Sequence, residues 1–222
     1  MKKMIALFSI IIFVGMYPAI GQVISEEEVI ELLNGHVLNL DNQSSSNLSF
    51  IRQVGDKNTA VSIQGQEGVV SNLVMMNQDG IENKSYIEQN GAEIKTYLWQ
   101  YNSANEANLW SLGQNIQTSV KQNGEGNIVN SYIENYGVNL RSATLFQEGN
   151  QNRIDLSLKG NGFGNNLVEQ TVIINQFGNQ HEVQAFMEPF SAPIEINQYP
   201  GIGGEGMKVN VSTSTFNFPM KK

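Results

Sequence analysis

A pattern of Gln, Gly and Asn recurs along this chain at an almost constant spacing. Each copy begins with Gln, and in most copies Gly stands two residues later and Asn five residues later. The initial glutamines are separated by 25, 22, 22, 25, 29 and 22 residues, so the basic period is 22 and the longer intervals contain insertions. They are Gln53, Gln78, Gln100, Gln122, Gln147, Gln176 and Gln198. A fixed period of this kind predicts a repeat fold in which each unit stacks on the next.

The residues after each glutamine predict a tight turn followed by a polar corner. Glycine and asparagine tolerate a positive φ angle, and they fill the second position. That position holds Gly55, Gly80, Asn102, Gly124, Gly149 and Gly178. The fifth position holds Asn58, Asn83, Asn105, Asn127 and Asn152, followed by His181 in the sixth unit. We expect the imidazole of His181 to take the place of an amide.

The segments that flank each turn alternate between two kinds of side chain, which indicates β-strands. One face holds aliphatic, small and amide residues, and only Arg141 brings a fixed charge to it. The other face takes the charges and most aromatic residues, such as Lys84, Tyr86 and Trp99. One unit cannot bury its inner face alone, whereas stacked units can form two facing parallel sheets.

The predicted fold is therefore an all-β solenoid of about seven strand-turn-strand rungs. The units lie near residues 47–64, 72–89, 94–111, 116–133, 141–158, 170–187 and 192–216. Rungs about 4.8 Å apart allow amides at equal offsets to bond along the stack, so the glutamines and asparagines are predicted to form ladders.

A second glutamine closes the first two units, at Gln64 and Gln89. The same position then holds Ser111, Ile133, Leu158 and Met187, so we expect the core to change from amide-rich to aliphatic along the chain.

The outer residue after each turn asparagine supports this alignment. Successive units place Thr59, Lys84, Glu106, Ile128, Arg153 and Glu182 at this position. Lys84 is expected to meet Glu106, and Arg153 to meet Glu182, because neighbouring opposite charges stabilise a sheet.

The beginning of the sequence predicts secretion. Residues 1–21 read as a signal peptide: Lys2 and Lys3 precede an apolar run, and Ala19 and Gly21 are suited to cleavage. A transmembrane reading is weaker, because the run is shorter than the roughly 20 residues that span a bilayer. The chain contains no cysteine, so no disulfide stabilises it. Its net charge of −8 argues against nucleic acid as a partner.

The repeat resembles the curlin repeat, Ser-x5-Gln-x-Gly-x2-Asn-x-Ala-x3-Gln, of the secreted subunits of bacterial curli. The match covers residues 47–187, with a degenerate seventh unit from Ala192 to about Phe216. The leading Ser of the motif is absent from this chain. Its position holds Asn47, Asn72, Ile94, Ile116, Arg141, Gln170 and Ala192.

The resemblance implies a subunit of extracellular, amyloid-like fibres that act in the biofilm matrix and in cell adhesion. It implies passage through the periplasm and an outer-membrane curli secretion machinery, with other curlin-like subunits as partners. Residues 22–46 would then be the leader recognised for secretion; the alternative is a poorly ordered leader. Residues 217–222 would be a C-terminal tail. The chain could be the major fibre subunit or a minor, nucleating or capping subunit.

A monomeric secreted adhesin or polysaccharide-binding module is the alternative function. Tyr97, Trp99, Trp110 and Tyr132 fall in the third and fourth units, where they could bind polysaccharide or a host surface or pack fibres laterally. We expect no enzyme, cofactor or metal site, because the sequence suggests no repeated carboxylate pair and no Ser-His-Asp set.

Overall fold

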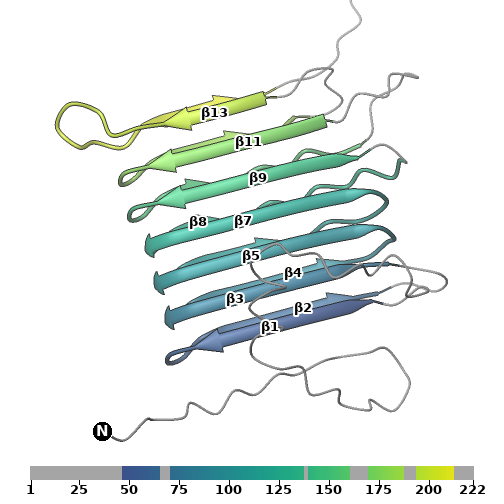
Figure 1. Cartoon of the computed structure of the whole chain (residues 1–222). Coiled ribbons are helices and arrows are strands. Elements are labelled where there is room, and N and C mark those ends of the chain that lie inside the picture. The colour runs from purple at the N-terminus through teal and green to yellow at the C-terminus, as the bar shows by residue number, and fades with distance from the viewer. Residues whose placement is uncertain (1–46, 66–70, 138–139, 161–169, 188–193, 213–222) are drawn as a thin grey trace, which may run out of the picture.

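The computed structural model describes residues 47–65, 71–137, 140–160, 170–187 and 194–212, which form one stack of β-strands (Figure 1). The expected signal peptide at 1–21, the leader at 22–46 and the tail at 217–222 lie outside these residues. Within the described ranges, no helix has the length and apolarity needed to cross a membrane.

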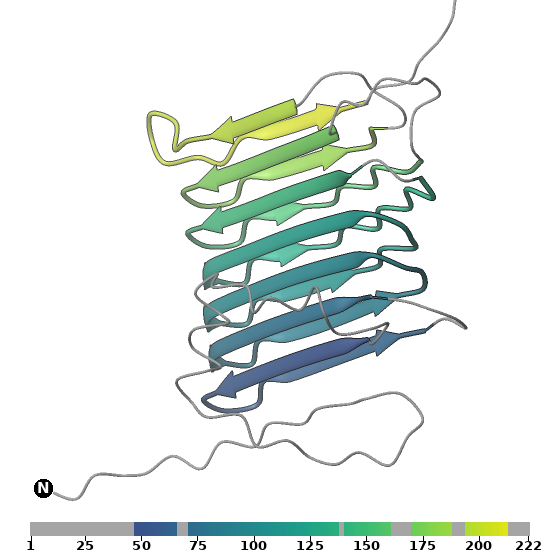
Figure 2. The ribbon, with the colours of Figure 1, turned by 45° about the vertical axis from the view of Figure 1, so that its right-hand side comes forward.

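Fourteen strands form two parallel sheets of seven strands each. The first sheet contains β1 (Leu48–Val54), β3 (Leu73–Ile81), β5 (Ile94–Ser103), β7 (Ile116–Glu125), β9 (Arg141–Glu148), β11 (Gln170–Phe177) and β13 (Ile194–Gln198). The second contains β2 (Thr59–Gln64), β4 (Lys84–Gln89), β6 (Glu106–Leu109), β8 (Ile128–Val129), β10 (Arg153–Ile154), β12 (Glu182–Ala185) and β14 (Lys208–Val211). Each odd-numbered strand turns into the next even-numbered strand, and this pair is one rung (Figure 2).

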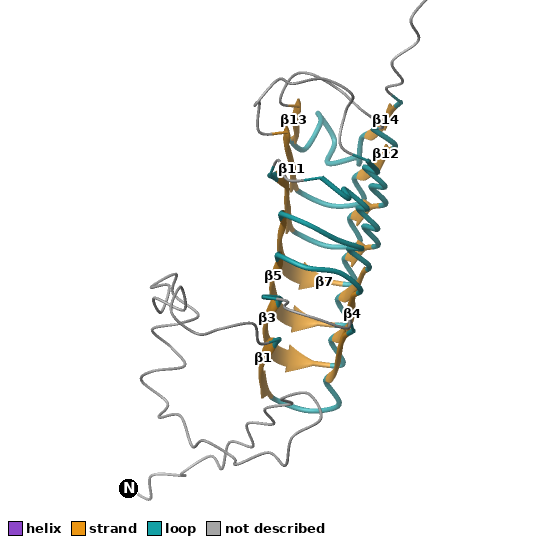
Figure 3. Ribbon diagram, turned by 90° about the vertical axis from the view of Figure 1, so that its right-hand side faces the viewer, coloured by secondary structure: helices purple, strands orange, loops and turns teal. Residues whose placement is uncertain are grey.

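The predicted β-solenoid is confirmed, and so is its register. Gln78 lies beside Gln53 on one side and beside Gln100 on the other, and the same alignment continues to Gln198. Seen edge-on, the two sheets face each other across a narrow interior (Figure 3). Insertions in the sequence fall between rungs, so they do not disturb the alignment of the strands.

The interior is filled by the face that alternation predicted to be buried. In β5, Ile94 and Leu98 are fully buried, whereas Tyr97 and Trp99 on the other face are partly exposed. Arg141 is also 1% exposed, and burial lowers the pKa of its guanidinium to about 10. Its Nη1 donates to the backbone carbonyls of Lys159 and Gly160, which compensates for the burial of the charge.

Two features differ from a regular alternation of strands. β8 and β10 are each only two residues long, and Ser131, Tyr132 and Ile133 after β8 have φ angles of 86°, 104° and 61°. Ile133 nevertheless remains buried in the core. On the outer face of the first sheet, Phe50 and Met75 are also buried, in a separate apolar cluster that the sequence did not predict.

Candidate functional site

The seven glutamines form one continuous hydrogen-bond ladder through the interior. In each step, the Nε2 of one glutamine donates to the Oε1 of the glutamine in the following rung. The six steps from Gln53 to Gln198 measure 2.7, 2.7, 2.8, 3.0, 2.8 and 2.8 Å. Every member after Gln53 is fully buried, so each amide depends on its neighbours for partners. The predicted glutamine ladder is confirmed.

The same glutamines also join the two sheets. The Nε2 of Gln78 donates to the carbonyl of Thr59 in the preceding rung at 3.0 Å. Gln100 makes the equivalent bond to Lys84, also at 3.0 Å, and the pattern continues up the stack. The sequence did not reveal this second bond, because the acceptor is a backbone group whose position depends on how closely the sheets approach.

The turns require glycine for two reasons. Gly80 and Gly124 have φ angles of 140° and 135°, which residues with a Cβ rarely adopt. A Cβ built on Gly80 would also lie 1.8 Å from the carbonyl oxygen of Asn102 in the next rung. Asn102 occupies the turn position of the third rung with a φ angle of 71° and donates through Nδ2 to Asn123 at 2.8 Å. The positive φ angles predicted for the turns are confirmed.

The turn asparagines form a second ladder. The Oδ1 of Asn58 accepts the backbone N–H of Asn83 at 3.0 Å, and each following rung repeats this bond. The Nδ2 of Asn58 donates to the carbonyl of Val54, four residues earlier, at 2.9 Å. Asn105 makes the equivalent bond to the carbonyl of Tyr101 at 2.8 Å, so Asn58 and Asn105 close their own turns, and every asparagine of the ladder fixes the next rung.

His181 reproduces the bonds of an asparagine in this ladder. Its Nε2 lies 2.8 Å from the carbonyl of Phe177, which is again four residues earlier. Its Nδ1 accepts the backbone N–H of Met207 in the last rung at 3.1 Å. These two contacts indicate the tautomer that carries its proton on Nε2. The predicted replacement of an amide by imidazole is confirmed.

A third, shorter ladder closes the first two rungs. Gln64 donates to Gln89 at 2.8 Å, and Gln89 donates to the hydroxyl of Thr96 at 2.9 Å. Buried Ile133 and Leu158 take over this position in later rungs, together with Ser111 and Met187. The core changes from amide-rich to aliphatic, as predicted.

The charged column on the outer face follows the predicted register, but its ion pairs differ. Arg153 lies beside Glu182, yet its ion pair at 2.9 Å is with Asp155 in its own rung, because that carboxylate is two residues away on the same face. Glu182 instead accepts from Lys208 of the last rung at 2.6 Å. The hydrogen bond from Lys208 is the main reason that the pKa of the Glu182 carboxyl is lowered.

The four aromatic residues of the third and fourth rungs lie on opposite faces of the solenoid. Tyr97 and Trp99 stack on the outer face of the first sheet, with ring centroids 6.1 Å apart. Trp110 and Tyr132 meet edge to face at 5.9 Å on the outside of the second sheet. This separation follows from the predicted strand-turn-strand unit, because Tyr97 and Trp99 precede the turn and Trp110 and Tyr132 follow one.

Among the described residues, no group of three or more His, Cys, Asp or Glu side chains is placed to hold a metal ion. Comparison of the whole chain with protein-family models, with curated proteins and with solved structures finds no match.

Proposed function

We propose that this protein is a secreted structural subunit that assembles end to end into curlin-like, amyloid-like extracellular fibres. The observation that carries the proposal is the unbroken glutamine ladder from Gln53 to Gln198. Parallel, in-register strands with stacked amides are the arrangement that polymerises in cross-β fibres. Such fibres would serve in the biofilm matrix and in adhesion, with other curlin-like subunits and an outer-membrane secretion machinery as partners.

The direction of the ladder gives its two ends complementary chemistry. Each Nε2 donates to the Oε1 of the following rung, so the first rung offers the Oε1 of Gln53 and the last rung offers the amide of Gln198. A second subunit whose last rung lay against this first rung would continue the ladder from Gln198 to Gln53. The strands β1, β2, β13 and β14 are the ends of the sheets and would pair in the same step.

A monomeric secreted adhesin or polysaccharide-binding module is the second candidate, and the last rung favours it. Here the Nε2 of Gln198 donates to the carbonyl of Met207 at 2.7 Å, within its own chain. The loop Pro200 to Gly206 brings Met207 to this position. Inside the stack, Gln122 makes the equivalent bond to the carbonyl of Asn127 at 2.9 Å and still donates to Gln147. The feature that favours a cap is therefore the loop itself, because Pro200 cannot donate to a ladder and terminal rungs of solenoids are commonly capped.

Fibre growth distinguishes the two candidates. The chain from Gln22 to Lys222 would be purified and incubated with and without pre-formed seeds, and the products followed by electron microscopy. Fibres that grow from seeds are the expected result. A chain that stays monomeric at high concentration, even with seeds, would refute the fibre subunit and favour the adhesin.

Two lysine substitutions test which end of the chain matters more for the junction between subunits, in which one first rung meets one last rung. Ile51 in the first rung and Ile196 in the last occupy the same inner column, and both pack against the core. The first rung contains no proline, whereas Pro200 follows β13 in the last rung and cannot donate to a ladder. We expect Ile51→Lys to stop seeded elongation and Ile196→Lys to slow it less. Equal effects, or a larger effect of Ile196→Lys, would contradict this difference between the two ends.

A further inference from the structure

Besides the charged column, the outer face of the second sheet carries two columns of side chains that have no role in the ladders. The first column is polar over most of its length and contains Tyr86, Asn108, Asn130, Asp155, Gln184 and Asn210. The second column contains Trp110, Tyr132, Ser157, Phe186 and Ser212. We call these two columns the second-sheet face. Amide groups and aromatic rings therefore lie side by side on one outer face.

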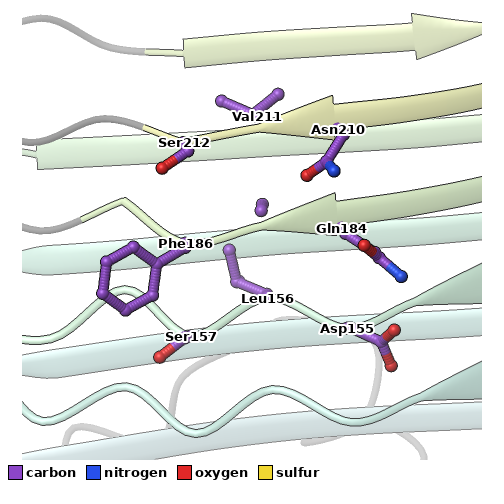
Figure 4. A pocket seen from close by; sticks show the side chains of 9 residues that line it. Asp155, Leu156, Ser157, Gln184, Phe186, Asn210, Val211 and Ser212 are labelled. Atoms are coloured by element: carbon purple, nitrogen blue, oxygen red, sulfur yellow. The ribbon is translucent and has the colours of Figure 1, made fainter.

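A hollow of about 360 Å³ lies on this face across the fifth, sixth and seventh rungs (Figure 4). Six outward side chains line it in a grid of two columns and three rows. The rows are Asp155 with Ser157, Gln184 with Phe186, and Asn210 with Ser212. The volume falls within the roughly 300 to 1,000 Å³ of small-molecule sites, and the lining combines one ring with several hydrogen-bonding groups.

Two further rings extend this surface beyond the hollow. Trp110 is 51% exposed and Phe186 is 37% exposed, and Tyr132 lies against Trp110. The three rings stand in one column from the third rung to the sixth, which is a length of about 14 Å at a rung spacing of about 4.8 Å. An aromatic ring with amides beside it suits a sugar ring, because the C–H face of the sugar packs on the aromatic face and its hydroxyls bond to the amides.

The charges beside the hollow nearly cancel. Arg153 is held by Asp155 at 2.9 Å, and Lys208 is held by Glu182 at 2.6 Å. Lys159 lies over the ring of Phe186, with its Nζ 4.8 Å from the ring centroid. Two of the cations nearest the hollow are thus engaged by carboxylates, and the whole chain carries a net charge of −8. These charges nearly cancel, so they give a polyanion no strong attraction, and the net charge of the whole chain opposes its approach; a neutral polymer is affected by neither.

We propose that the second-sheet face binds a neutral polysaccharide lying along the stack. Sugar rings pack on Trp110, Tyr132 and Phe186, and their hydroxyls bond to the carboxylate of Asp155 and the amide of Gln184. The site is complete within one chain, so binding does not require fibre assembly. In a fibre the same face would recur with every subunit, and multivalency would strengthen binding to a long polymer.

The two tryptophans of the chain provide a matched test, because they lie in the same rung on opposite outer faces. The variant Trp99→Phe keeps only Trp110, and Trp110→Phe keeps only Trp99. Each would be titrated with soluble hexasaccharides of β-1,4-linked glucose, xylose and N-acetylglucosamine while tryptophan emission is followed. We expect a saturable change with at least one sugar in Trp99→Phe and no change in Trp110→Phe.

A third variant, Phe186→Ala, tests the hollow. We expect it to weaken hexasaccharide binding about tenfold, which corresponds to about 1.4 kcal/mol, while the circular dichroism spectrum stays unchanged. The proposal is wrong if no neutral hexasaccharide changes the emission of Trp110, or if both tryptophans respond equally. If Phe186→Ala alters only the lateral bundling of fibres, the face is a contact between fibres. Because seeded growth is measured separately, failure here leaves the fibre proposal intact.

Discussion

Replacing Gln100 by leucine tests how strongly the glutamine ladder stabilises the solenoid. Gln100 is fully buried, accepts from Gln78 at 2.7 Å, and donates to Gln122 at 2.8 Å and to the carbonyl of Lys84 at 3.0 Å. Leucine removes all three bonds and leaves the Oε1 of Gln122 facing an apolar side chain, whereas the Nε2 of Gln78 keeps its bonds to the carbonyl of Thr59 at 3.0 Å and to the hydroxyl of Ser85 at 3.2 Å. At about 1 to 3 kcal/mol for the buried oxygen that loses its partner, and about 0.5 to 1.5 kcal/mol for each of the other two bonds, the cost is roughly 2 to 6 kcal/mol.

The greater apolar surface of leucine offsets about 1 kcal/mol of this cost. We therefore expect Gln100→Leu to lower the free energy of unfolding by about 1 to 5 kcal/mol, mainly through the lost amide partners. Urea unfolding at low protein concentration, followed by circular dichroism before fibres form, would measure it. The matched control is Gln117→Leu, an exposed glutamine on the outer face of β7, which should change stability by less than about 0.5 kcal/mol. Equal losses in the two variants would refute the ladder argument.

Three further predictions concern the turns and the last rung. Lengthening the loop Gly65 to Ser71 by two residues should barely change the melting temperature, because loop-closure entropy grows slowly, whereas the same insertion within Asn123 to Gly126 should lower it clearly. His181→Asn should preserve stability because an amide supplies the same donor and acceptor, and His181→Leu should cost about 1 to 3 kcal/mol in urea unfolding. Because the pKa of Glu182 is lowered in the folded chain, its ion pair with Lys208 stabilises the fold fully above the ordinary carboxyl pKa. This stabilisation is lost as the pH falls through the lowered pKa. Hydrogen exchange protection of β14 should therefore fall with acidification, and Lys208→Met should reduce that dependence.

Two of these results would contradict the reasoning directly. Equal tolerance of the two insertions would show that the corner is not a fixed four-residue turn. A large loss of stability in His181→Asn would show that the imidazole does more than replace an amide.

Much of the fold could be predicted from the sequence because parallel stacking is a local rule repeated many times. Residues at equal offsets in successive units lie directly above one another, so the spacing of Gln53, Gln78 and Gln100 fixes the register without knowledge of the three-dimensional structure. The glycine turns were predictable for the same reason, since each unit needs a positive φ angle at one position.

The sequence failed where contacts join different columns or different sheets. The ion pair of Arg153 with Asp155 competes with the expected contact to Glu182, and only side-chain geometry decides between them. The buried outer cluster around Phe50 and Met75 was missed because alternation places these residues on the exposed face.

The sequence by itself determined the period, the strands, the turns and the identity of the ladder residues, because these depend only on offsets along the chain. The tertiary structure alone decided how the two sheets are joined and what their outer faces present. The bond from Gln100 to the carbonyl of Lys84 requires a particular distance between the sheets. The stacking of Tyr97 on Trp99 and the edge-to-face contact of Trp110 with Tyr132 require the positions of the rings in space. Such contacts arise from distances in space that no spacing in the sequence records.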